Sequence, residues 1–354
     1  SEQVYRELQQ RLDTYSLGFP ATESGIEIRI LKRLFSPEDA TMFMALTPKV
    51  EEPALIAEKT DMATEETAKK LEDMARRGLL FRLDKGDGPR YGAIPFIHGI
   101  WEFQVKDLDP ELSEMMEQYM REGLDNSMRD NADYFLRTIP VEESIVVDNR
   151  IASYDDAREI LSSQDLIVVT DCICRKHKST LESDCGKPME VCFMFGSMGQ
   201  YYLDNNMGRK VTLDEAEKIL RESRNAGLVT QPATAQNPGG MCNCCGDCCG
   251  VLRALNMHPS PAEMVFSNYQ AVVREQECTA CEACADICQM EAISVGESEC
   301  AVVDQDRCIG CGLCVTQCPT EAVQLRTKPE DKQRVPPARS ADQMMAMARK
   351  RGMM

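Results

Sequence analysis

Long apolar runs are missing from this sequence, and no stretch approaches the length that a helix needs to span a bilayer. Nucleotide-binding glycine patterns are missing too: no G-x-G-x-x-G follows a strand pattern and no P-loop occurs, so nothing supports an intrinsic flavin or nicotinamide site. The sequence also lacks a basic excess. Its net charge of −18 disfavours nonspecific attraction to nucleic acid or to anionic membranes.

A secretory leader is also not found. The opening SEQVYRELQQRLDTY has the pattern of a charged amphipathic helix and contains no twin arginine. Eighteen cysteines in 354 residues could suggest a disulfide framework, but they cluster in short runs that are typical of metal ligation. We therefore expect a cytoplasmic protein of a reducing, anaerobic environment, with two or three domains.

The most informative feature that is present is a repeated cysteine run. Its two copies are Cys278, Cys281, Cys284 and Cys288, then Cys308, Cys311, Cys314 and Cys318. Each copy reads C-x2-C-x2-C-x3-C, and Glu291 and Glu321 begin similar flanking segments after them. Repetition of both the cysteines and the flanks indicates a duplicated fold.

This spacing resembles that of bacterial-type two-cluster ferredoxins, in which the fourth cysteine of each run ligates the other [4Fe–4S] cluster. The resemblance covers residues 273–326 and implies two clusters. The ligands of the first would be Cys278, Cys281, Cys284 and Cys318, and those of the second Cys308, Cys311, Cys314 and Cys288. Gln289 stands where the family usually has proline. Two zinc sites are the alternative, but zinc modules rarely use four cysteines this tightly spaced, twice.

Residues 1–100 predict a different module. After a first helix, the patterns predict helices at 37–46, 53–59 and 64–77, a strand at 79–83 and a return strand from Arg90. This order resembles a winged helix-turn-helix. The helix at 64–77 carries as many acidic as basic residues, which is poor for phosphate affinity. The sequence therefore favours a protein-contacting or structural role over DNA binding.

Residues 101–140 predict a helical linker that starts at Asp109 and Pro110, with a methionine-rich stripe that we interpret as core. Residues 141–272 predict a cysteine-rich α+β domain, with strands at 144–147 and 166–170. The second strand runs into Cys172 and Cys174, which as alternate residues of an extended chain would share a face.

Nine cysteines in this middle segment exceed what core packing requires, and they predict one or two additional [4Fe–4S] clusters. One would be held by Cys172, Cys174, Cys185 and Cys192. The other would be held by four of Cys242, Cys244, Cys245, Cys248 and Cys249. Ligands could also be exchanged between the two groups. His177 is expected to be a solvated loop residue and Cys300 a buried apolar one, while Arg175 could offset cluster charge.

The fold class is therefore α+β multidomain, and the order of its parts resembles large multi-cluster ferredoxin-type proteins of anaerobic bacteria. That resemblance implies electron transfer in a larger redox system, more as a component of an oxidoreductase than as a stand-alone enzyme. A flavoprotein donor and an acceptor oxidoreductase are the expected partners. Residues 327–354 form a basic, methionine-rich tail with a helix from Ser340. We expect this tail to be frayed, and a helix that docks on a partner is the alternative.

Two other functions remain open. One is a redox-sensing winged-helix transcription regulator, in which cluster oxidation alters the winged helix. The other is a reductase whose cluster in the Cys242 to Cys249 region has an open coordination site.

Overall fold

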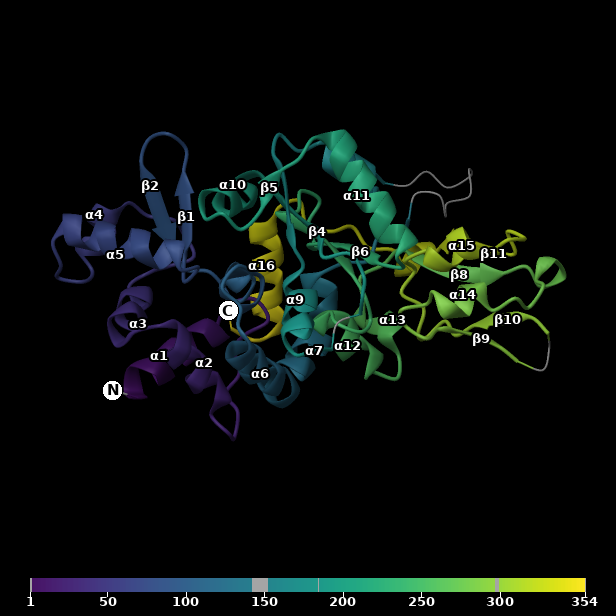
Figure 1. Ribbon diagram of the computed structural model, residues 1–354, viewed down its shortest axis with the longest axis horizontal. Coiled ribbons are helices and arrows are strands. Elements are labelled where there is room, and N and C mark those ends of the chain that lie inside the picture. Colours follow the sequence, from purple (N-terminus) through teal and green to yellow (C-terminus); the bar gives the residue numbers. More distant parts are fainter. Residues whose placement is uncertain (1, 142–151, 184, 297–298, 354) are drawn as a thin grey trace.

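The computed structural model describes residues 2–141, 152–183, 185–296 and 299–353, and the strand expected at 144–147 lies outside them. The protein is mixed α/β with several small sheets. The N-terminal module and the domain with the repeated cysteine runs lie at opposite ends of the long axis, and the largest sheet lies between them (Figure 1).

The N-terminal module packs short helices beside a hairpin. Its elements are α1 (Glu2–Asp13), α2 (Ile26–Leu34), α3 (Pro37–Met44), α4 (Pro53–Ala57), α5 (Thr64–Arg76), β1 (Phe81–Asp84) and β2 (Pro89–Gly92). Ser36 and Asp39 form a reciprocal capping box at the start of α3. The buried Asp39 carboxylate also binds Lys70 of α5 and Arg77, the residue that follows this helix. Both cations are therefore already paired within the module.

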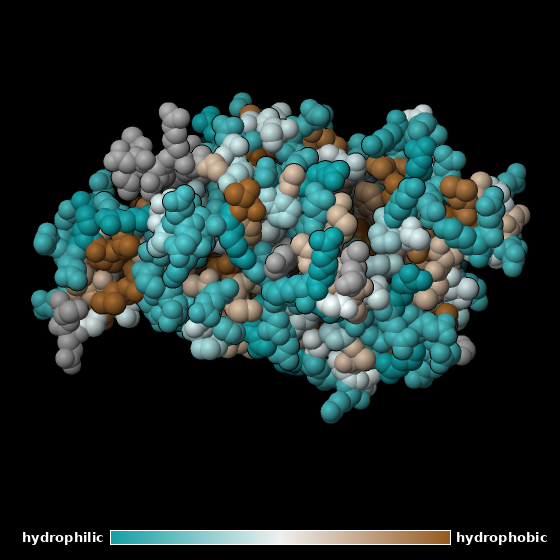
Figure 2. Space-filling model, turned by 180° about the vertical axis from the view of Figure 1, so that it is seen from behind, coloured by the Kyte–Doolittle hydropathy of each residue, from teal (hydrophilic) through white to brown (hydrophobic). Residues whose placement is uncertain are grey.

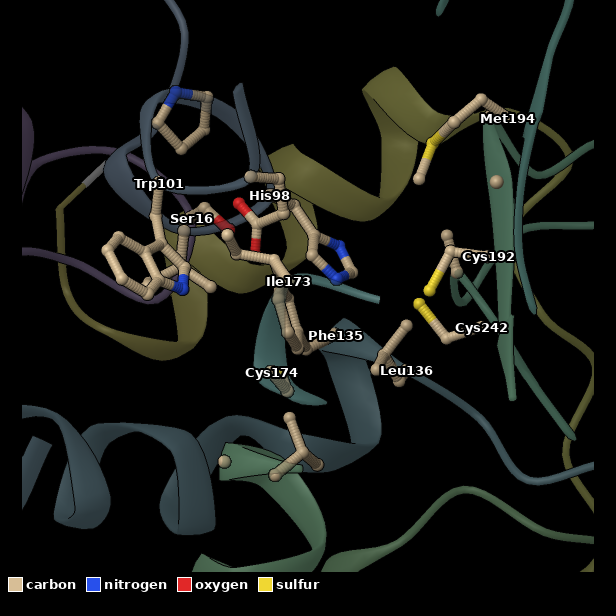
Figure 3. Close-up of a pocket in the computed structure, with 18 of the residues that line it drawn as sticks. Ser16, His98, Trp101, Phe135, Leu136, Ile173, Cys174, Cys192, Met194 and Cys242 are labelled. Carbon is tan, nitrogen blue, oxygen red and sulfur yellow. The ribbon is translucent and has the colours of Figure 1, made fainter. Parts of the chain in front are cut away.

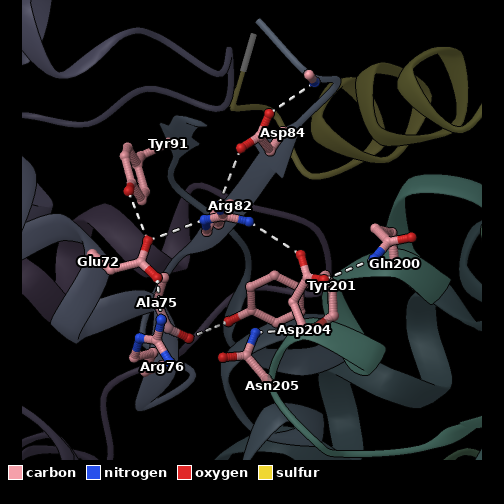
Figure 4. Close-up of polar contacts among 11 residues, drawn as sticks. Glu72, Ala75, Arg76, Arg82, Asp84, Tyr91, Gln200, Tyr201, Asp204 and Asn205 are labelled. Carbon is pink, nitrogen blue, oxygen red and sulfur yellow. Dashed lines mark hydrogen bonds and ion pairs between the residues drawn. The ribbon is translucent and has the colours of Figure 1, made fainter. Parts of the chain in front are cut away.

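Arg82 of the hairpin makes charged contacts with the middle of the molecule (Figure 4), and Phe81 beside it packs on the Tyr201 ring. Arg82 of β1 binds Glu72 of α5, Asp84 of its own strand and Asp204 of α10 (Gly196–Asp204). Tyr201 of α10 also donates a hydrogen bond to the main-chain oxygen of Ala75. The hairpin is therefore engaged in protein contacts.

The linker begins with short turns, η1 (Phe96–Ile100) and η2 (Glu102–Gln104), and continues as α6 (Pro110–Tyr119), η3 (Met120–Leu124) and α7 (Asp125–Phe135). Asp109 caps α6 as the sequence predicts. The methionine stripe is core: Met115, Met116, Met120 and Met128 are all buried. Glu117 of α6 joins this helix to the next domain by binding His177, Lys178 and Arg253.

The middle domain is built on an antiparallel sheet with the strand order β5-β3-β4-β7-β6. Its elements are η5 (Ser153–Asp155), α8 (Ala157–Ser162), β3 (Ile167–Asp171), α9 (Ile173–Thr180), β4 (Glu190–Phe195), α10, β5 (Arg209–Lys210), α11 (Leu213–Asn225), β6 (Val229–Pro232), β7 (Gly240–Cys244), α12 (Gly250–Asn256) and α13 (Pro261–Met264). Alternate residues of β3 serve two cores: Ile167 and Val169 join the core of α8 and α11, whereas Val168 joins the larger core.

The C-terminal domain has an internal two-fold pattern. Its elements are β8 (Tyr269–Val273), η6 (Glu275–Glu277), α14 (Ala283–Asp286), β9 (Ile293–Val295), β10 (Ala301–Val303), α15 (Leu313–Gln317) and β11 (Val323–Thr327). Strand β8 pairs with β11 and β9 pairs with β10, both antiparallel. The strand pairing repeats at the same thirty-residue interval as the cysteine runs. Ala271 of β8 opposes Leu325 of β11, and Ala301 of β10 opposes Val295 of β9. Ala301 lies thirty residues after Ala271, and Val295 lies thirty residues before Leu325.

The C-terminal tail is docked, contrary to the frayed segment that we expected. After η7 (Glu330–Lys332), helix α16 (Ser340–Lys350) returns to the centre of the molecule and packs against α7 (Figure 1). Met347 is buried on that face, and Arg351 donates to the Asp13 carboxylate at 2.9 Å. The tail therefore ties the N-terminal module to the centre.

Candidate metal centres

Eight thiols of the repeated runs form two groups in the C-terminal domain. One small cavity is lined by Cys278, Cys281, Cys284 and Cys318. A second is lined by Cys288, Cys308, Cys311 and Cys314. Each group thus combines three cysteines of one run with the last cysteine of the other, which is the crossed arrangement that the resemblance implies.

The backbone around these thiols repeats in the same crossed way. The amide of Ala271 donates to Cys308 Sγ at 3.4 Å, and that of Ala301 donates to Cys278 Sγ at 3.3 Å. Amides also donate to the last cysteine of each run, from Ala292 to Cys288 and from Val323 to Cys318. Amide donors favour a thiolate over a neutral thiol and tune the potential of a cluster. The donor set therefore fits thiolate-bound iron.

Six thiols of the middle domain line a third cavity of about 220 Å³. Cys174, Cys192 and Cys242 are labelled in its close-up (Figure 3). The six thiols belong to Cys172, Cys174, Cys192, Cys242, Cys244 and Cys249, and neighbouring thiols interact around a closed ring. We call this set the six-thiol ring. Helix α16 covers the same cavity with Met344 and Met347, so every module except the C-terminal domain contributes to its wall.

This grouping differs from the main division expected from the sequence and corresponds to the exchange of thiols between the two groups that the sequence left open. The structure brings Cys172, Cys174 and Cys192 together with three thiols of the second group, and Cys185 lies elsewhere, beside Cys245 and Cys248. The two thiols near β3 also do not share a strand face, because the strand ends at Asp171. Cys172 precedes α9 and Cys174 lies inside that helix. Cys300 is half-buried and belongs to neither cavity-lining group nor the ring.

His98 faces the six-thiol ring, and nothing in the sequence signals it. Its ring stacks on Phe135 with centroids 4.0 Å apart, near Cys192 and Cys242 (Figure 3). Burial opposes its charge, but a hydrogen bond with Cys242 and the nearby Glu102 carboxylate together raise the pKa of His98. The backbone at His98 is left-handed, with φ 55°.

Arg175 places a buried positive charge against the thiols. Its Nη1 lies 3.8 Å from Cys245 Sγ, Nη2 donates to the main-chain oxygen of Asn243, and buried Nε has no partner. In the described part of the chain, no carboxylate lies within ion-pair distance of it. Burial tends to lower the pKa of Arg175, but charges at Cys172 and Cys192 outweigh that effect and raise it. A buried cation needs nearby negative charge, which thiolates can supply.

His177 is not the solvated residue that the sequence suggested. Its side chain is fully buried in α9, and Nε2 lies 3.0 Å from a Glu117 carboxylate oxygen. Burial opposes the charge of Glu117, but the hydrogen bonds with His177, Arg253 and Lys178 outweigh it and hold the pKa of that carboxyl well below its usual range. His177 therefore holds α9 against the linker and is not a member of the six-thiol ring.

Gln289 joins the two cysteine-rich regions. Its side-chain oxygen accepts from the Gly246 amide at 2.8 Å, and its main-chain oxygen accepts from Asn256 at 3.0 Å. Gln289 follows Cys288, and Gly246 follows Cys245, so this contact places one thiol group of the C-terminal domain next to the middle domain. Proline at position 289 would have no side-chain acceptor for that amide.

Comparison with known protein families finds a match for one part of the chain. Residues 301–324, which include the second cysteine run, match the family described as a 4Fe-4S binding domain, Fer4. No curated protein and no solved structure matches the chain. The match and the cysteine groups support an iron–sulfur, ferredoxin-like part with at least one [4Fe–4S] cluster and an electron-transfer role. Among the helices described, none is both long and apolar enough to cross a membrane.

Proposed function

We propose that this chain is a multi-centre iron–sulfur protein that relays low-potential electrons, with two [4Fe–4S] clusters in its C-terminal domain and a third in the six-thiol ring. The observation that carries the proposal is the crossed grouping of the eight C-terminal thiols, together with the 4Fe-4S family match over one of the two runs. When bound, such clusters accept and donate single electrons.

The protein's own residues would hold, tune and separate these centres. The first cluster would be held by Cys278, Cys281, Cys284 and Cys318, and the second by Cys288, Cys308, Cys311 and Cys314. Main-chain amides donate to four of these sulfurs. The Gln289 contact keeps the Cys288 loop against the middle domain, so the two cysteine-rich regions stay adjacent.

A third centre is supported by the charge of Arg175. Because the charges of the ring thiols Cys172, Cys192 and Cys244 act on this buried guanidinium and no carboxylate among the described residues faces it, anionic sulfur is the counter-charge available to it. Four thiols of the six-thiol ring suffice for a cubane cluster. Thiolate ligands of this kind require a reducing environment, consistent with the cytoplasm of an anaerobic organism as the setting that we propose.

The partners that we propose are a flavoprotein donor and an acceptor oxidoreductase, met singly or inside a larger complex. Between residues 275 and 325 the sequence carries ten acidic side chains and one basic one, Arg307. An acidic surface of this kind speeds and orients encounter with a basic partner. Arg307 itself is used internally, donating to Met290 and Asn256.

A winged-helix regulator is less well supported. The order of α3 to β2 fits such a module, but Lys70 and Arg77 bind Asp39, and Arg82 of the hairpin binds three carboxylates. Cations already paired with carboxylates are poor phosphate ligands. We expect no shift of duplex DNA by the oxidised or the reduced protein at low salt, and salt-dependent, sequence-specific binding would revive the regulator.

A reductase is the second candidate, and a specific observation favours it. The six-thiol ring has two thiols beyond the four of a cubane, and its cavity also contains His98 and apolar side chains such as Trp101 and Tyr202. An uncommitted thiol beside a histidine suits thiol or disulfide chemistry. A change in the EPR spectrum of the reduced protein on adding a small disulfide would support this candidate, whereas an unchanged spectrum would count against it.

The main proposal is tested by anaerobic iron and sulfide quantitation with an EPR redox titration. Three cubanes predict about twelve irons per chain. Cys311→Ser should remove about four irons and a C-terminal signal, and Cys174→Ser should perturb a different signal. Protein that contains zinc in place of iron at the C-terminal thiols would overturn the proposal.

A further inference from the structure

Three thiols form a group apart from the other cysteines. Cys185, Cys245 and Cys248 have Sγ atoms that all lie within 4.8 Å of one another, and those of Cys185 and Cys245 are 3.7 Å apart. Cys245 and Cys248 are buried and Cys185 is half-buried. Their chain neighbours Cys244 and Cys249 belong to the six-thiol ring, so each adjacent pair contributes one thiol to each group. We call the three the thiol triad.

The spacing of the triad fits a single ion. For tetrahedral metal–sulfur bonds of about 2.3 Å, neighbouring sulfurs lie about 3.8 Å apart. The thiolates of a cubane bind different irons, and so they stand farther apart. Within the described residues, no three of the eight C-terminal thiols lie as close together as the triad does. The triad is therefore more compact than the groups that fit a cluster.

The charges fit a divalent cation. Three thiolates and one divalent ion leave one negative charge, and the Arg175 guanidinium, 3.8 Å from Cys245 Sγ, would neutralise it. Thiolate donors select Zn²⁺ over Mg²⁺ or Ca²⁺. Asp247, which lies between two triad members in the chain, is 64% exposed and its carboxylate lies 3.8 Å from Lys187 Nζ, so it is not a member of the triad.

We propose that Cys185, Cys245 and Cys248 bind one Zn²⁺ ion, with a water molecule in the fourth position on the half-buried side of Cys185. The ion would tie the loop before β4 to the loop between β7 and α12. That second loop runs between Cys244 and Cys249 of the six-thiol ring, but the three zinc ligands are not members of the ring. This site is independent of the proposed electron-transfer function.

The test uses the full chain purified without oxygen and without added zinc. Elemental analysis should find about one zinc per chain, and the zinc K-edge EXAFS should show three sulfurs at about 2.3 Å and one lighter atom at about 2.0–2.1 Å. Cys185→Ser and Cys248→Ser should each lower zinc occupancy at least tenfold without reducing the iron content. Cys300→Ser, which changes a cysteine outside all four thiol groups, should leave zinc unchanged.

Three results would overturn the site. They are native protein without zinc, EXAFS that shows zinc bound to four sulfurs or to fewer than three, and a loss of about four irons in Cys248→Ser. The EXAFS measurement needs only the native chain, so it decides the question even if the variants do not fold. Iron content and EPR report separately on the proposed clusters, and their failure would leave the zinc result standing.

Discussion

Single backbone positions in the cysteine runs show how closely the two halves of the C-terminal domain are matched. Gly310 and Gly312 are left-handed in the second run, and Ala280 and Glu282, thirty residues earlier, adopt the same conformation. A side chain in this region costs roughly 1–2 kcal/mol. The first run therefore carries strain that glycine removes in the second.

Gly310→Ala and Ala280→Gly should consequently have unequal effects on stability. A Cβ at Gly310 would lie 2.1 Å from the main-chain oxygen of Tyr269, so alanine there must displace backbone beside Cys308 and Cys311. We expect the visible absorbance of the clusters to be lost at least tenfold faster in urea. Ala280→Gly, which relieves strain but frees the unfolded chain, should change stability by less than about 1 kcal/mol. Equal effects of the two variants would contradict this account.

Gln289 is a second single residue with a testable role, because its side chain joins the C-terminal domain to the middle domain at the Gly246 amide. We call this contact the junction. Gln289→Ala removes the acceptor of the Gly246 amide and should cost about 1 kcal/mol at the junction. Hydrogen exchange should therefore be about fivefold faster in peptides that contain Gly246, with the exposed Gln317→Ala as the control. Gln289→Pro, the usual family residue, should give at least the same increase. Unchanged exchange in both variants would show that the domains are held together by other contacts.

At the scale of elements, helix α16 decides whether the six-thiol ring is covered. Met347 is 1% exposed and lines the cavity, whereas Met345 on the same helix is 40% exposed. Met347→Asp should undock α16, because it loses a buried methionine worth about 1.5–3 kcal/mol and would bury a charge.

For the clusters that we propose, the expected result is faster removal of iron from the six-thiol ring by a chelator, with no change in the C-terminal domain. EPR spectra recorded after timed chelation distinguish iron in the six-thiol ring from iron in the C-terminal domain. Met345→Asp should behave as the native protein. If Met347→Asp keeps the native chelation rate, α16 does not protect the ring.

At the scale of the whole molecule, contacts between modules hold the cavity together. Arg82 joins the hairpin to α10, Glu117 joins the linker to the middle domain, and Arg351 joins the tail to the N-terminal module. On the face shown in Figure 2, hydrophilic residues dominate and hydrophobic ones form separate groups. Recognition of a redox partner through the acidic C-terminal domain should therefore depend on charge.

Electron exchange with a basic redox protein should slow by about tenfold as ionic strength rises from low salt to above physiological salt. Stopped-flow measurement of cluster oxidation checks this. A small neutral oxidant, which is not steered by charge, should react at the same rate throughout. A salt-independent rate with the basic protein would mean that the acidic surface does not guide encounter.

The sequence by itself determined the features that depend on near neighbours. The repeated runs at Cys278 and Cys308 and the helices at α6 and α16 could be read from it, because ligand spacing, capping and helical periodicity are local properties. The crossed grouping of thiols came from the family resemblance, since spacing alone does not say which run supplies a fourth ligand.

Only the tertiary structure decided how the middle cysteines are divided. The six-thiol ring joins residues from 172 to 249 across β4, β7 and α9, and His98 reaches it from η1. No local pattern reports that β3 ends before Cys172, or that the adjacent thiols of Cys244 and Cys245 belong to different thiol groups. Those outcomes depend on long-range packing of sheet, linker and tail, which places residues together regardless of their distance in the chain.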